Sequence, residues 1–111
     1  MKYLITESQL DKVIFKYLDN QDFIQIYKSP NRIYFVNSEG DEYAQITYDK
    51  DIKWCFINLD LTREVSSFFS LQSHDSIEVI GRWVENTLQM NVKNAVRRPT
   101  RSGFELKIRK K

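Results

Sequence analysis

Apolar residues at helical spacing predict an amphipathic helix near the start of the chain. Four residues, from Thr6 to Gln9, have the spacing of a capping box, in which Thr6 would be the N-cap. The helix would run for about three turns and end near Asn20. Its apolar stripe consists of residues three and four apart: Leu10, Val13, Ile14, Tyr17 and Leu18.

Four segments with strand-like patterns follow this helix, and short turn sequences separate them. Pro30 lies in the first turn, and Gly40, which tolerates positive φ, lies in the second. Parallel strands need a long crossover connection, so links this short favour an antiparallel meander. The predicted strands are residues 23–28, 32–37, 42–48 and 52–59.

Two further helical patterns occupy the second half of the chain. The first is short, contains Val65, Phe68 and Phe69, and would be capped by Asp60 or Thr62. The second is stronger and spans about residues 76–90, with Glu78, Arg82 and Glu85 on its outer side. Its apolar stripe is formed by Ile77, Ile80, Trp83, Val84 and Leu88.

The end of the chain returns to the two-residue period of a strand. Phe104, Leu106 and Ile108 alternate with polar residues, which predicts a terminal strand. Residues 95–98 would form a hairpin with it across a turn at 100–103. We therefore expect residues 1–111 to form a single α+β domain of two layers. In it, an antiparallel meander of four to five strands packs against two or three helices, and residues from about 91 to 111 form a basic C-terminal strand or hairpin.

Composition supports a reduced globular domain. The lone Cys55 lies in an apolar run and cannot form an intramolecular disulfide, so we expect a buried thiol. Acidic residues interrupt the N-terminus too early for a signal peptide, and no segment approaches the ~18 apolar residues of a membrane helix. These features favour a cytoplasmic protein without a membrane partner.

Charge is distributed unevenly along the chain. The net charge is +2, yet residues 1–90 carry nine Lys and Arg against fourteen Asp and Glu, whereas residues 91–111 carry eight against Glu105 alone. If the C-terminal hairpin forms, its cations would crowd one edge and attract phosphate groups, and Phe104 could stack on a base. The alternatives are that they guard an edge strand or pair with the acidic remainder of the chain. The candidate binding residues are Arg97, Arg98, Arg101, Phe104, Lys107, Arg109, Lys110 and Lys111.

Residues that could carry catalysis or bind a metal are sparse. The single histidine, His74, lies in a polar segment before a predicted helix, so we interpret it as a solvated residue and not as a general base. A buried Cys55 would have a raised pKa, which disfavours nucleophilic attack. The acidic segment 49–51 is more typical of a hairpin turn than of a Ca²⁺ or Mg²⁺ loop. Glycine-rich phosphate-binding motifs are absent, so we predict neither catalytic residues nor a cofactor nor a metal.

The segment MKYLITESQL at residues 1–10, together with Arg82–Met90 and Glu105–Ile108, resembles small orphan proteins of tailed phages of aquatic bacteria. The resemblance covers about the first ten and the last thirty residues. It implies a phage origin, and therefore the cytoplasm of a host cell. That group has no assigned activity, so the resemblance transfers no site residue.

Tyrosines in the predicted strands, together with a tryptophan, suggest a binding surface. One face of the meander would be covered by helices, and five residues could line the other: Tyr27, Tyr34, Tyr43, Tyr48 and Trp54. The alternative is that they complete the core. We expect a non-enzymatic accessory protein that binds another protein or itself, as a homodimer, through this aromatic face or the basic end. The alternative function is nucleic-acid binding by the basic C-terminal segment, and an enzyme ranks third.

Overall fold

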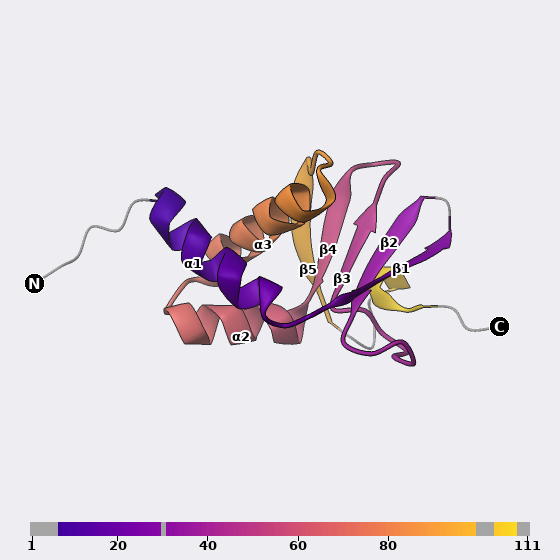
Figure 1. The fold of residues 1–111 in the computed structure, drawn as a ribbon, viewed down its shortest axis with the longest axis horizontal. Helices are drawn as coiled ribbons and strands as arrows, with labels where there is room; N and C mark the ends of the chain where they lie inside the picture. Colours follow the sequence, from indigo (N-terminus) through magenta and orange to yellow (C-terminus); the bar gives the residue numbers. More distant parts are fainter. Residues whose placement is uncertain (1–6, 30, 100–103, 109–111) are drawn as a thin grey trace, which may run out of the picture.

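The computed structural model describes residues 7–29, 31–99 and 104–108. It has an α+β fold, in which three helices lie on one face of a five-stranded open sheet (Figure 1). The predicted fold class is therefore confirmed. The elements in chain order are α1 (Glu7–Asp19), β1 (Ile24–Ser29), β2 (Arg32–Val36), β3 (Ile46–Asp49), β4 (Trp54–Asn58), α2 (Leu59–Phe69), α3 (Ser73–Leu88), β5 (Asn94–Arg98) and the short 3-10 helix η1 (Phe104–Leu106).

The strands lie in the order β1-β2-β3-β4-β5. The first four form the predicted antiparallel meander, but β5 pairs with β4 in parallel, with Cys55 opposite Ala95. The prediction of a wholly antiparallel sheet was wrong at this point, because α2 and α3 provide the long crossover that a parallel neighbour requires.

The predicted C-terminal hairpin does not form in the described chain. Residues 104–106 form a 3-10 helix, and Lys107 makes only a single antiparallel bridge, to Tyr43. Leu106 and Ile108 are both buried against a face of the sheet. Their alternation therefore belongs to a segment that covers this face and not to a strand beside β5. The predicted turn at 100–103 lies outside the described residues.

The N-cap of α2 and the start of α3 differ from the predictions. The Asn58 side chain caps α2 by accepting a hydrogen bond from the Asp60 N–H (2.8 Å), so neither Asp60 nor Thr62 is the N-cap. Thr62 instead lies buried inside the helix. Helix α3 begins at Ser73, three residues before the predicted start, and its N-cap is Gln72. The predicted cap of α1, Thr6, lies outside the described residues.

The main core lies between the helices and one face of the sheet. Ile14 and Leu18 of α1 are fully buried there, but Val13 is 56% exposed, contrary to the predicted stripe. Helix α1 turns the side that carries Asp11 and Asp19 toward α3. Asp11 accepts two hydrogen bonds from Arg82 (2.7 and 2.9 Å), and Val13 lies on the opposite side of the helix, in solvent.

A second apolar cluster covers the opposite face of the sheet. It contains Tyr34, Val36 and Phe56 from the sheet, together with Leu106 and Ile108 from the C-terminal segment. Two backbone hydrogen bonds hold the segment, from Ala44 N–H to the Leu106 carbonyl and from Ile108 N–H to the Glu42 carbonyl. We call residues 104–108 the C-terminal strap.

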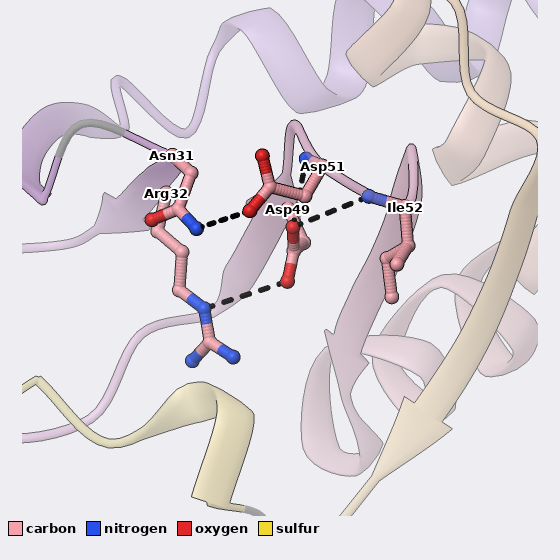
Figure 2. A network of polar contacts seen from close by, with 5 residues as sticks. All are labelled: Asn31, Arg32, Asp49, Asp51 and Ile52. Atoms are coloured by element: carbon pink, nitrogen blue, oxygen red, sulfur yellow. Dashed lines mark hydrogen bonds and ion pairs between the residues drawn. The ribbon is translucent and has the colours of Figure 1, made fainter.

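The turn between β3 and β4 is built around Asp49 (Figure 2). One carboxylate oxygen accepts hydrogen bonds from the Asp51 and Ile52 N–H groups (2.9 and 3.4 Å), and the other lies 3.6 Å from Nε of Arg32. Asn31 donates a side-chain hydrogen bond to Asp51. The acidic segment 49–51 therefore uses its carboxylates to shape a hairpin, as the turn interpretation predicted.

Candidate functional site

A groove of about 330 Å³ lies between α3 and the beginning of β5. Four apolar or small residues contribute to its lining, Ile77 and Gly81 from α3 and Val92 and Ala95 from the returning chain. Its volume is at the lower end of the range of ligand-binding pockets, roughly 300–1,000 Å³. A concave site with apolar lining and polar neighbours is the usual form of a binding site.

The groove depends on the close approach of α3 to β5 at two small residues. A Cβ atom added at Gly81 would lie 3.1 Å from the Cβ atom of Ala95, closer than ordinary van der Waals contact. Glycine costs stability inside a helix, so its presence here is explained by the space it leaves. A side chain at position 81 would require Ala95 or the helix to shift by a few tenths of an ångström.

Polar side chains of α3 form one wall of the groove. His74, the second residue of the helix, has a side chain that is 71% exposed, and its Nε2 lies 3.3 Å from Asp75. The side-chain ligand atoms of His74, Asp75 and Glu78 all lie within 4.8 Å of one another, and all three residues are exposed. Exposed carboxylates in the first turn of a helix are common, because they favour the positive end of its dipole.

Two further charged residues of the groove, Arg82 and Glu85, hold the fold in place. Glu85 accepts a hydrogen bond from the Val92 N–H (3.1 Å), which fixes the loop that leads into β5. Arg82 is held by both carboxylate oxygens of Asp11. His74 and the acids thus do not converge in an enclosed polar pocket, because one of these acids anchors a loop and the histidine faces solvent.

The groove adjoins an edge of the sheet, because β5 stands last in the strand order. Just before β5, the Lys93 N–H donates to the Lys53 carbonyl (2.7 Å), toward β4. Backbone groups of successive strand residues point in opposite directions within the sheet plane. By this alternation the N–H and C=O groups of Val96 point away from β4, where the described chain places no further strand.

The predicted basic site is dispersed in the described part of the chain. Arg97 lies on the helix side and donates to Ser73 Oγ (2.8 Å). Arg98 lies on the opposite side, 3.3 Å from Glu105 and over the Phe56 ring at 5.4 Å from its centroid.

Further along the predicted basic site, Lys107 lies 4.0 Å from Glu42. The backbone of Phe104 begins η1, and its side chain is not described. The remaining predicted residues lie outside the described ranges: Arg101, Arg109, Lys110 and Lys111. Three of the predicted cations therefore contact acidic or hydroxyl side chains on two different faces, instead of forming one patch.

The predicted aromatic surface on the second sheet face is also not exposed as expected. Tyr34 is buried beside the strap, and Trp54 is partly buried. Tyr48 lies in the helix-side core and donates its hydroxyl to the Asn91 carbonyl (2.5 Å). Tyr43 lies before β3 and bridges to Lys107, and only Tyr27 is largely exposed. The alternative interpretation, in which these residues complete the core, is correct for Tyr34 and Tyr48.

Cys55 is fully buried on the helix side of β4. Burial in apolar surroundings strongly raises the pKa of its thiol, because the thiolate would lose its hydration. The predicted burial of Cys55 is confirmed, and its thiol has neither the exposure nor the ionisation that nucleophilic attack requires.

Comparisons of this chain with protein-family models, with curated proteins and with solved structures found no match. Within the described ranges, no helix is both long and apolar enough to cross a membrane.

The sequence did not predict the groove. The one sequence feature that could have indicated it is Gly81. An isolated glycine within a strong helical pattern often has a packing reason.

Proposed function

We propose that this protein is a non-enzymatic interaction protein that binds an extended segment of another polypeptide along the open edge of β5. The observation that carries the proposal is the position of the groove, directly beside an edge strand. Peptides that add a strand to a sheet edge gain affinity from backbone hydrogen bonds and specificity from pockets for alternate side chains. Here the edge and the pocket lie next to each other.

The chemistry of the groove defines the segment it would accept. Alternate residues of an added strand point to the same face of a sheet, so every second side chain would enter the groove on the helix side. The apolar side chains of Ile77, Val92 and Ala95 favour small aliphatic groups on their side of the groove. The proposed partner is therefore an extended segment with small apolar residues at alternate positions.

The edge of β5 is suited to an added strand in a second respect. Edge strands are commonly protected by proline, bulges or a covering element. The parallel register of β5 with β4 continues without a bulge from Asn94 to Arg98, and proline follows only at Pro99. Five successive residues can thus present a regular backbone edge.

The test is selection from a random eight-residue peptide display library on the intact protein, followed by binding of the selected peptides to variants. Val96→Pro removes an N–H that points away from β4, so it should abolish binding while leaving the sheet intact. Val96→Ala is the matched control, because it trims the same side chain and keeps the N–H. It should bind the peptides nearly as well as the parent protein.

Circular dichroism and thermal unfolding of both variants establish that they are folded. Chemical-shift changes should centre on Ala95, Val96 and Ile77. Equal binding by Val96→Pro and Val96→Ala would refute strand addition, and a library that yields no binding sequence would refute the proposed function itself.

A further inference from the structure

A second surface is independent of the groove and lies where α1 and α2 meet. Tyr17 of α1 stacks on Phe68 of α2 with ring centroids 4.9 Å apart, and it meets Phe69 edge to face at 5.4 Å. Phe68 is nevertheless 67% exposed. Val13, also mostly exposed, lies one turn before Tyr17 on the same side of α1. We call Val13, Tyr17 and Phe68 the aromatic seam.

A single exposed apolar residue is ordinary on a protein surface, but Phe68 belongs to a group of apolar residues, and such a group requires an explanation. Three apolar side chains from two helices are contiguous, and aromatic residues are the usual anchors of protein interfaces. Stacking on Tyr17 also holds the Phe68 ring in place. The seam is therefore a preorganised apolar surface.

Charges of opposite sign lie on the two sides of the seam. On α1 the exposed residues beside it include Lys12 and Lys16, whereas the acids Asp11 and Asp19 of this helix are bonded to Arg82 and Trp83 of α3. On α2 the exposed charged residues are Asp60, Arg63 and Glu64. Glu64 lies four residues before Phe68 and Asp60 four residues before Glu64, so both lie on the side of the seam, whereas Arg63 points away from it. Glu64 also interacts with the Tyr17 hydroxyl. The α1 side is thus basic and the α2 side acidic.

We propose that the aromatic seam binds a second copy of this chain through a two-fold symmetric contact. A surface with a basic half and an acidic half around an apolar centre is complementary to itself when it is rotated by half a turn. The lysines on α1 of each copy would then face Glu64 and Asp60 on α2 of the other. A partner of a single charge would be attracted by one half of the seam and repelled by the other, so a second copy fits best.

The seam is small, so we expect a weak dimer that forms as the protein concentration rises. Stable interfaces bury roughly 1,200–2,000 Å² in total, and the seam supplies only the centre of such an area. Sedimentation over a concentration series should show a reversible monomer–dimer equilibrium. Phe68→Ser should weaken it at least about tenfold, because Phe68 is the central anchor.

Ile52→Ser provides the matched control for a change in surface hydrophobicity. Ile52 is another exposed aliphatic residue, but it lies in the turn between β3 and β4. The dimer should form equally well in this variant. If Ile52→Ser weakens association as much as Phe68→Ser does, the association is nonspecific and hydrophobic and does not depend on the seam.

Charge reversal tests whether Lys16 of one copy faces Glu64 of the other. Lys16→Glu alone places two acids opposite each other in its own homodimer, and Glu64→Lys alone places two lysines opposite each other. Both single variants should therefore dimerise less than the parent protein. A mixture of the two should form a heterodimer, because every Lys16–Glu64 pair becomes attractive again in that complex.

An effect of these changes within one chain could not be reversed by mixing two different chains. A strictly monomeric parent protein, or single variants that fail to associate when mixed, would overturn the proposal. Because neither residue lies near the groove, this outcome leaves the peptide-binding proposal separately testable.

Discussion

The two faces of the sheet are both apolar, but they are covered in different ways. Three helices cover one face, with Leu18 and Ile80 fully buried among them. On the other face the strap provides Leu106 and Ile108, held by two backbone hydrogen bonds and by the ion pairs of Arg98 with Glu105 and of Lys107 with Glu42. A cover with few contacts opens locally at lower free energy than a helical layer does.

This difference explains why the apolar second face is not exposed as predicted. The same alternation that suggests a binding strand at residues 104–108 instead gives the strap its two buried side chains. Both proposed binding surfaces, the groove and the aromatic seam, therefore involve the helices instead of the second face. The second face contributes stability, and how much it contributes can be measured.

The largest expected effect comes from truncating one leucine on each face. Leu18 and Leu106 are both fully buried, so each change to alanine removes the same atoms. We expect Leu18→Ala to cost about 3–5 kcal/mol of unfolding free energy and Leu106→Ala about 2–3 kcal/mol, because a short segment can settle into the space that a truncated side chain leaves. Urea denaturation of both variants measures the difference.

Hydrogen exchange sharpens the same comparison. The Ala44 and Ile108 N–H groups, which hold the strap, should exchange faster in Leu106→Ala, while amides of α3 should change only with global stability. Equal costs for the two leucine changes, together with uniform exchange, would mean that the strap and the helices unfold as one unit.

The second expected effect is a pH dependence of stability that arises on the helix face of the sheet. Burial raises the pKa of the Cys55 thiol on the helix face above its unfolded value of 9.0. The folded protein thus keeps a proton that the unfolded chain releases. Its contribution to stability is complete below about pH 9 and is lost as the pH rises, by about 1.4 kcal/mol per pH unit once the unfolded thiol is ionised. Burial also raises the pKa of Tyr48, which adds to the loss above pH 10.

Urea denaturation at pH 8, 9 and 10 measures this loss, which should reach about 1 kcal/mol between pH 9 and 10 for the thiol alone. Cys55→Ala should reduce the slope in that interval even though it lowers stability at every pH by leaving a cavity. An unchanged slope in the variant would mean that water reaches the thiol in the folded protein.

Local periodicity predicted most of the fold because most of its contacts follow from single elements. The stripes of α1 and α3 and the turns of the meander are determined within about ten residues each. The parallel pairing of β5 was not predictable in this way, since it depends on how α2 and α3 together return the chain to β4. Val13 shows the same limit, because its exposure depends on which side of α1 contacts α3.

The candidate site was harder to predict than the fold. The groove arises where Gly81 approaches Ala95, two residues that are unremarkable by themselves. The seam arises where Tyr17 meets Phe68, which both belong to predicted apolar stripes and would each be assigned to the core. Sites formed between elements have no period of their own, so composition and spacing do not reveal them.

The smallest expected effect examines how tightly the strap closes the second face. Thr47 lies on this face between Tyr34 and Phe56 and is fully buried, and its hydroxyl has no hydrogen-bond partner among the described residues. A buried hydroxyl without a partner costs about 1–3 kcal/mol. Thr47→Val keeps the shape and removes this cost, so we expect the variant to be more stable by about 1 kcal/mol in urea denaturation.

Thr62→Val is the matched control. Thr62 is equally buried, but its hydroxyl donates to the Asn58 carbonyl (3.1 Å), so the same substitution should destabilise the protein by about 0.5–1.5 kcal/mol. If Thr47→Val brings no gain while Thr62→Val brings the expected loss, the Thr47 hydroxyl must be hydrated. Because the strap lies over this face, such a result would mean that the strap admits water and that the second face is accessible to ligands after all.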